Sequence, residues 1–327
     1  MERFVFVAAI VIAVIFGIGA LVAPNVNFDF DGEGMGTAEL VSVAPGNMAP
    51  AVYAGTNVKV RSAAANVFII PEDRTDISVE IDNAAGKAPM PSVSVDGDTV
   101  IIDGNLRGRI ASCRDDGGAS LRGYGDVAGT ELPRITIRAP RTVNLERAGA
   151  GTTDIGATQA LDLDLSGCSN ATVGDVTGEF ALDLAGAGDV HAGAARSFNA
   201  DIAGAGDVTL GAVAEGANID IAGAGSVVIA SLAGDLVTDA AGAGNITVQA
   251  GSVNRADIDM AGSGDIEINA PVRTLVVSMV GAGDVTVSGE VGDLEAEIAG
   301  VGEVNVPRVT GSLRQEIHGP GSVNVGQ

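Results

Sequence analysis

Two series of mostly acidic residues recur through the C-terminal half of the chain every 18 to 20 residues, and these side chains could do chemistry together. They flank glycine-rich hexapeptides such as AGAGDV, which occurs at 185–190 and again at 203–208. The first acidic column comprises Asp164, Asp183, Asp201, Asp220, Asp239, Asp259, Ser278, Glu297 and Glu316. The second acidic column comprises Asp189, Asp207, Ser226, Asn245, Asp265, Asp284, Glu303 and Ser322. Stacked carboxylates ~5 Å apart repel one another unless cations, hydrogen bonds or raised pKa values relieve them.

One chemistry that such columns offer is calcium binding, because Ca²⁺ takes several carboxylate and carbonyl oxygens. The candidate ligands are Asp189, Asp207, Asp265 and Asp284. The alternative for the second acidic column is that Asp, Asn and Ser accept hydrogen bonds from turn amides. For the first acidic column, the alternative is a solvated face that keeps the protein soluble. No other metal or cofactor is expected.

Catalysis is not predicted, and we assign no catalytic residue. Acidic-polysaccharide cleavage needs grouped carboxylates beside basic residues, with aromatic rings for sugar stacking. The chain has no Trp, and Arg196, Arg255 and Arg273 are scattered. His191 and His318 occupy different positions of the repeat, so they form no catalytic pair.

The two cysteines, Cys113 and Cys168, permit one disulfide if the domain is exported. Two separate buried thiols are the alternative. Neither histidine has zinc-ligand spacing to a cysteine.

The elements that position these residues follow from the glycines. The first glycine of each corner recurs at the same 18- to 20-residue interval, most regularly at Gly186, Gly204, Gly223, Gly242, Gly262, Gly281, Gly300 and Gly319. A unit this short cannot bury its own apolar face, so it must stack on copies of itself. Glycine is required where φ is positive and neighbouring corners leave no room for a Cβ.

Apolar residues alternate with polar ones on both sides of each corner, as Leu182 and Leu184 do before it and Val208 and Leu210 do after it. Such alternation predicts short strands with one apolar face. Consecutive coils then pair in parallel, and the fold class is all-β, a single-stranded parallel β-helix of ~19-residue coils.

The N-terminal part divides further. Residues 1–23 contain an apolar run, 4–23, that is long enough to cross a membrane, either as an uncleaved anchor or as a cleaved signal. Both of these export the domain, and a buried core helix is the remaining alternative. Residues 24–56 read as a linker, 57–134 as irregular β coils and 135–327 as regular β-helix repeats.

Charge limits the choice of partners. The sequence has 42 Asp and Glu against 18 Lys and Arg, a net charge of −24, which excludes nucleic acid as a natural partner. One stretch stands out from this background, GNLRGRIASCRDDGGASLRGYGD at 104–126, with Arg107, Arg109, Arg114 and Arg122. It is either a cap on the open edge of the helix or an interaction loop.

The D-[LI]-A-G-A-G-D-V units, preceded by strands such as PRITIRAP, resemble the head GIN domain family of auto-transporter adhesin heads. The resemblance is clearest over residues 135–325. It implies an exported, single-stranded right-handed β-helix, and it supplies no catalytic residues to carry over to this sequence.

Together these features predict a non-enzymatic module of the bacterial cell envelope that binds a surface protein or glycan. Its domain would lie in the periplasm or outside the cell, tethered to the inner membrane through residues 4–23 or secreted after cleavage. The alternative functions are an envelope spacer without a specific ligand and a calcium-binding solenoid.

Overall fold

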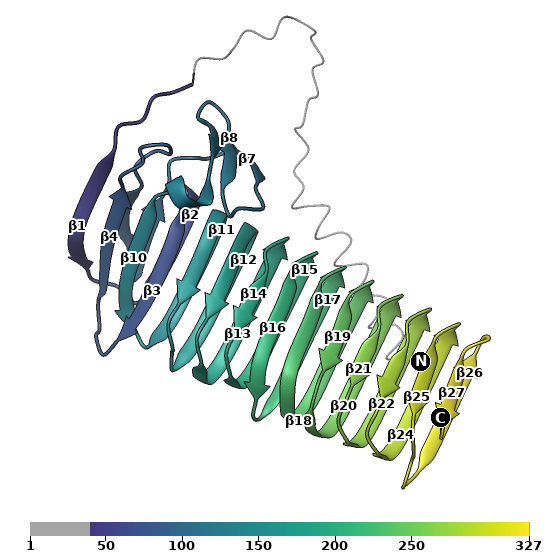
Figure 1. Ribbon diagram of the computed structural model, residues 1–327. Coiled ribbons are helices and arrows are strands. Elements are labelled where there is room, and N and C mark those ends of the chain that lie inside the picture. Colours follow the sequence, from purple (N-terminus) through teal and green to yellow (C-terminus); the bar gives the residue numbers. More distant parts are fainter. Residues whose placement is uncertain (1–39, 327) are drawn as a thin grey trace, which may run out of the picture. The chain divides into compact units, whose positions relative to one another are not determined.

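The computed structural model describes residues 40–326, which form one unit. The expected membrane segment at 4–23 lies outside these residues. In the described part, no helix is long and apolar enough to span a membrane. The described chain is almost entirely β, with one short 3₁₀ helix, as the alternation predicted (Figure 1).

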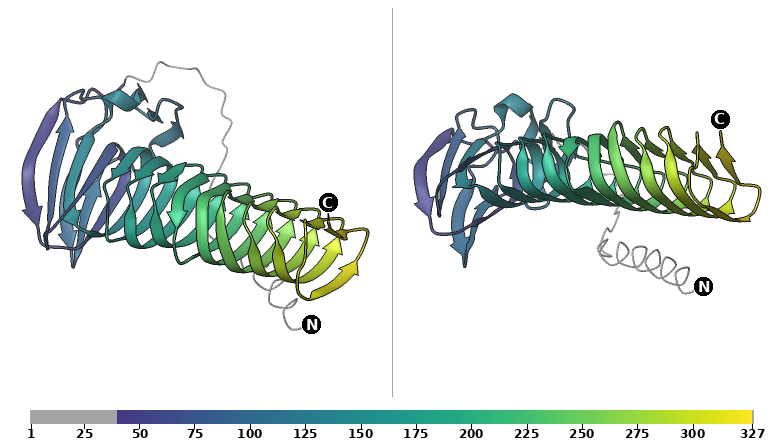
Figure 2. Two further views of the ribbon diagram at one scale, coloured as in Figure 1. Left: turned by 60° about the horizontal axis from the view of Figure 1, so that its bottom comes forward. Right: turned by 90° about the horizontal axis from the view of Figure 1, so that it is seen from below.

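The regular part is a β-solenoid of parallel coils about 19 residues apart, and the expected coil architecture is confirmed. Its strands are β11 (Thr142–Ile155), β12 (Ala160–Val173), β13 (Val176–Gly186), β14 (Val190–Ala192), β15 (Ala195–Gly204), β16 (Asp207–Val213), β17 (Gly216–Gly223), β18 (Ser226–Gly242), β19 (Asn245–Val248), β20 (Gly251–Gly262), β21 (Ile266–Ile268), β22 (Val272–Gly281), β23 (Val285–Val287), β24 (Val291–Gly300), β25 (Glu303–Val306), β26 (Leu313–His318) and β27 (Ser322–Val325). Figure 2 shows these coils stacked in order, with β26 and β27 in the outermost one.

The core of the solenoid is built from columns of apolar side chains. Leu182, Leu184 and their register partners on the next coils point inward, and nearly all are less than 10% exposed. Burial of each such Leu, Ile or Val side chain contributes roughly 1.5–3 kcal/mol. Phe180 and Phe198 add the only aromatic pair among the described residues, with ring centroids 5.4 Å apart.

The N-terminal coils are less regular and mix parallel with antiparallel pairing. Their strands are β1 (Gly46–Tyr53), β2 (Asn57–Ala64), β3 (Asn66–Glu72), β4 (Ile77–Asn83), β5 (Ser92–Asp96), β6 (Thr99–Asp103) and β10 (Arg134–Pro140). β11 pairs with both β2 and β3. From β3 the sheet continues through β10 and β4 to an edge at β1, and from β2 it continues through β6 to an edge at β5. β1 lies in the range expected to be a linker.

A separate three-stranded antiparallel sheet lies between β6 and β10 in the sequence. It contains β7 (Ile110–Cys113), β8 (Ala119–Leu121) and β9 (Gly125–Val127), followed by the 3₁₀ helix η1 (Gly129–Glu131). Its apolar side chains, including Leu121 and Val127, pack on Ala64 and Ala150 of the first coils. The stretch 104–126 therefore covers the side of the solenoid and leaves the edge strands β1 and β5 unpaired by this sheet.

Candidate binding surface

Stacked glycines form the corner of every regular coil and set the geometry of the acidic columns on either side. Gly223 is in register with Gly204 and Gly242, and Gly204 has a φ of +137°. A Cβ on Gly223 would lie closer than 3.0 Å to the carbonyl oxygen of Gly204. The same clash with the preceding corner occurs at Gly186, Gly204, Gly242, Gly262, Gly281, Gly300 and Gly319. The corner thus brings successive backbones closer together than any side chain would allow.

Residues of the second acidic column hold successive coils together by hydrogen bonds. The amide of Asp284 donates to Oδ1 of Asp265 over 3.1 Å, and the amide of Glu303 donates to Oδ1 of Asp284 over 2.9 Å. The same contact links Asp207 to Asp189 and Ser226 to Asp207. In each case the side chain of one coil accepts from the backbone of the next coil. All four calcium candidates therefore already use one carboxylate oxygen as an acceptor for a corner amide.

The first acidic column is a row of outward carboxylates on the strands before the corner, interrupted at Ser278. Asp183, Asp201 and Asp220 are direct register partners on β13, β15 and β17. Burial, and then repulsion from Asp201 and Asp239, raise the pKa of Asp220 to about 6. Burial also raises the pKa of Asp183, where a hydrogen bond with Asp164 adds to the effect. With their pKa values raised, these carboxyl groups take up protons in mild acid, and protonation relieves the repulsion within the stack.

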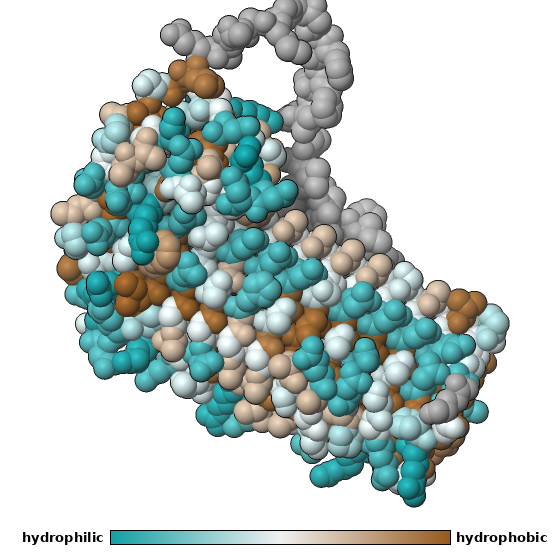
Figure 3. Space-filling model, viewed as in Figure 1, coloured by the Kyte–Doolittle hydropathy of each residue, from teal (hydrophilic) through white to brown (hydrophobic). Residues whose placement is uncertain are grey.

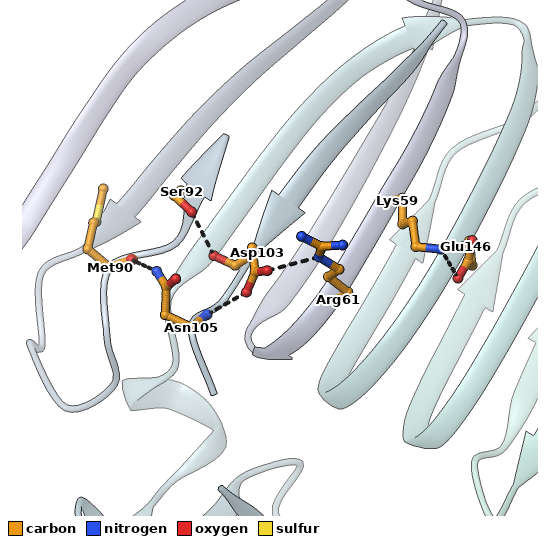
Figure 4. Close-up of polar contacts among 7 residues, drawn as sticks. All are labelled: Lys59, Arg61, Met90, Ser92, Asp103, Asn105 and Glu146. Carbon is orange, nitrogen blue, oxygen red and sulfur yellow. Dashed lines mark hydrogen bonds and ion pairs between the residues drawn. The ribbon is translucent and has the colours of Figure 1, made fainter. Parts of the chain in front are cut away.

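A cation closes the N-terminal end of the first acidic column. Glu146 is the register partner of Asp164, and Lys59 Nζ lies 2.6 Å from the Glu146 carboxylate (Figure 4). Beside this pair, Arg61 Nε donates to Asp103 Oδ2 over 2.9 Å, and the Asn105 amide donates to the other oxygen of Asp103. These contacts tie β2 to β6 and β11 at the start of the stack.

The structure pairs Cys113 of β7 with Cys168 of β12 in a disulfide, their Cα atoms 6.1 Å apart. Cys168 occupies the position between the two glycines of a regular corner, since Gly167 is in register with Gly186. The disulfide therefore fastens the small sheet to a solenoid corner.

Three arginines gather at the base of the β7–β8 hairpin, and we call Arg107, Arg109 and Arg122 the arginine patch. All three side chains are exposed. Arg109 lies over the Tyr124 ring, 5.6 Å from its centroid, and Arg122 Nη1 donates to the Gly108 carbonyl over 3.3 Å. No carboxylate among residues 40–326 forms an ion pair with any of the three. Figure 3 shows hydrophilic residues mixed with apolar ones over this end of the molecule.

Arg114 behaves differently from the arginine patch. Its guanidinium pairs with Asp116 and Asp126 at 3.3 and 3.2 Å. It is therefore neutralised within the small sheet, although the sequence grouped it with the other three.

A buried arginine that the sequence analysis did not single out organises the first corners. Arg147 is 2% exposed and occupies a core column, in register with Leu165. It donates to the carbonyls of Ala65, Ala150 and Thr152 and to the hydroxyls of Thr153 and Ser169. Burial lowers its pKa to about 9, so it stays charged at neutral pH. The sequence did contain a sign of this role, because Arg147 lies two residues before Gly149, at a position where other coils carry a buried apolar residue.

The remaining candidates do not converge on a site. His191 lies on β14, whereas His318 lies on β26, 3.1 Å from Glu316. Among the described residues, no group of three or more His, Cys, Asp or Glu side chains is arranged to hold a metal ion.

Comparison with protein families identifies the repeats. Segments 180–291 and 237–326 match the family described as "Putative auto-transporter adhesin, head GIN domain". Residues 180–326 therefore match the head GIN domain family. This confirms the family resemblance that the repeat motif indicated, over the coils from β13 onward. No curated protein matches the chain.

Several solved structures are similar to the chain at low identity. A "putative adhesin" from Parabacteroides distasonis ATCC 8503 is 14% identical, with 86% of this chain and 97% of that chain covered and a TM-score of 0.42. A "putative adhesin" from Bacteroides fragilis NCTC 9343 is 17% identical, with 87% and 99% covered and a TM-score of 0.36. A "Putative lipid binding protein" from Parabacteroides distasonis ATCC 8503 is 18% identical, with 85% and 97% covered and a TM-score of 0.37.

Proposed function

We propose that the protein is a non-catalytic binding module of the bacterial cell envelope, in which the solenoid is a scaffold and the arginine patch recognises a surface glycan or protein. The observation that carries this proposal is the arginine patch itself. Three exposed guanidinium groups that form no ion pair with residues 40–326 stand on a chain of net charge −24. Guanidinium groups bind carboxylate and phosphate in a bidentate geometry, so the partner carries anionic groups.

The build of the small sheet supports this assignment. The disulfide fixes the small sheet, and the contact of Arg109 with Tyr124 and the hydrogen bond from Arg122 to Gly108 hold two of the three arginines in place before any ligand arrives. Such preorganisation lowers the cost of binding. The family description of an adhesin head agrees with this role.

The same proposal covers the location and the coil geometry. Residues 4–23 would tether the domain to the inner membrane, or would direct its secretion if they are cleaved, so that the solenoid faces the periplasm or the exterior. The right-handed coil sense comes from the family resemblance alone.

The direct test is binding of the full chain to an acidic polysaccharide such as alginate, with neutral dextran as the control polymer. A variant that removes the arginine patch should lose binding while its melting curve stays unchanged. Unchanged binding by that variant would reject the patch as the recognition surface.

The calcium-binding solenoid is a weaker candidate, because Asp265 and Asp284 each already accept a corner amide through one carboxylate oxygen. The envelope spacer without a ligand is the third candidate. It would show neither polymer binding nor a specific response to Ca²⁺.

A further inference from the structure

The last coil of the solenoid presents apolar side chains that all earlier coils bury. Leu313 is 48% exposed and Val325 is 43% exposed, whereas their register partners Leu294 and Val306 are 1% and 3% exposed. β26 and β27 pair only with β24 and β25 among the described strands, and Figure 2 shows them at the outer end of the stack. An edge of this kind invites pairing with another strand.

Among the described strands, none pairs with the open side of β26 or β27. The Leu294 amide donates to the Ser312 carbonyl over 2.9 Å, so the backbone N–H and C=O groups of the even-numbered residues in β26 point toward β24. Because these directions alternate along a strand, the N–H and C=O groups of Leu313, Gln315 and Ile317 point outward. On β27 the Ser322 amide donates inward to Gly302, which leaves Val323 and Val325 facing out.

The sequence of this edge is complementary to itself. When β26 pairs antiparallel with a second β26 about Gln315, Leu313 lies opposite the partner's Ile317 and Arg314 lies opposite the partner's Glu316. When β27 pairs with a second β27 about Asn324, Val323 lies opposite the partner's Val325. Both registers place core side chains on core side chains, and the β26 register also places opposite charges on each other. Gln315 and Asn324 are separated from the corner at Pro320 by similar numbers of residues, one before it and one after it. A single twofold axis can therefore pass through both strands.

Gln315 has a special place in this arrangement. It occupies a core column, in register with buried Ala296. On the twofold axis its side-chain amide would meet the same group of the second chain. A polar residue at one core position is a known means of fixing the register of a pairing.

We infer that two copies of this chain associate end to end. In this dimer β26 pairs antiparallel with the second β26 and β27 with the second β27, across a twofold axis at Gln315 and Asn324. This interface caps the core at the last described coil, and it is closed at two chains because a twofold axis pairs the same edge of both.

Site-specific cross-linking tests the geometry. Gln315→Cys in the full chain, in mild detergent and at ~0.15 M salt to screen the net charge, should form a disulfide-linked dimer under mild oxidation. Ser252→Cys, exposed on a central coil, is the matched control and should not. Equal cross-linking of both variants, or none at Gln315→Cys, would overturn the proposal.

A charge exchange tests the register. Arg314→Glu or Glu316→Arg alone places like charges opposite each other twice per dimer, and should weaken association at least ~10-fold in sedimentation velocity. The double variant, Arg314→Glu with Glu316→Arg, should restore it. Melting curves of each variant show whether loss of the Arg314–Glu295 pair has altered the fold itself. A dimer equally stable in all four proteins contradicts this interface.

Discussion

The amide of Asp284 donates a hydrogen bond to Oδ1 of Asp265 on the preceding coil, over 3.1 Å. The Asp carboxylates of the second acidic column therefore also accept hydrogen bonds from the corner amides of the following coil. Repetition of this contact between coils gives each Asp a structural reason to be there, independent of any ion.

We accordingly expect Ca²⁺ to act on this protein only as a general counterion. Thermal unfolding in Ca²⁺, Mg²⁺ and EDTA at fixed ionic strength should show equal shifts of the midpoint for the two cations. A saturable rise with Ca²⁺ that Mg²⁺ does not produce would establish calcium binding along the second acidic column.

The corner glycines should tolerate no side chain. Gly223→Val drives a Cβ into the Gly204 carbonyl, and we expect a loss of at least ~3 kcal/mol in the free energy of unfolding. Gly97→Ala is the control, because Gly97 also has a positive φ, +58°, but its Cβ would meet no atom within 4 Å. It should cost only ~1 kcal/mol. Similar losses in both variants would show that backbone conformation matters here and corner stacking does not.

The first acidic column should make the protein more stable in mild acid. Because the pKa of Asp220 is raised to about 6 in the folded state, the folded chain binds a proton more tightly than the unfolded chain. Stability therefore falls as the pH rises from about 4 through 6. Asp220→Asn should remove part of this slope and stabilise the protein at pH 7 by ~1 kcal/mol, after allowance for solvent screening. Denaturant unfolding across this pH range measures the slope. Asp115→Asn, in the exposed loop after β7, should leave it unchanged.

The disulfide should stabilise the small sheet. Cys113→Ser opens a loop with a sequence separation of 55 residues, and we expect a loss of ~2–4 kcal/mol. Reduced and non-reduced wild type should migrate differently on a gel, and the Cys113→Ser variant should show no such difference. Two free thiols in the native protein, found by thiol titration, would contradict the pairing.

The periodicity of the sequence was sufficient to predict the coils, because the regular coils repeat the same relation between corner glycine, inward apolar residue and outward residue, which is a carboxylate in all but the coil with Ser278. Gly186, Leu184 and Asp183 have the same roles as Gly204, Ile202 and Asp201 one coil later. The hydrogen bonds within the second acidic column were not predictable in detail. Alternation fixes which residues stack, but it does not show that an Asp accepts from the amide of the following coil.

The N-terminal part was harder to predict because its contacts are not repeated. β1 pairs with β4 through a bulge after Met48, and no periodic neighbour indicates that register. The arginines of 104–126 also looked alike in sequence, yet Arg114 is paired with Asp116 and Asp126 while Arg109 contacts a ring. Only the folded hairpin distinguishes them.

The central claim is that the arginine patch is the recognition surface and the solenoid its scaffold. The most direct measurement is biolayer interferometry of the full chain on alginate and on isolated cell-envelope material. It compares the triple variant Arg107→Ala, Arg109→Ala, Arg122→Ala with a second triple variant, Arg196→Ala, Arg255→Ala, Arg273→Ala, which removes the same charge from the solenoid. We predict at least ~10-fold weaker binding for the first triple and near-wild-type binding for the second. Equal losses in both triples, or no binding by the wild type to either surface, would contradict the account.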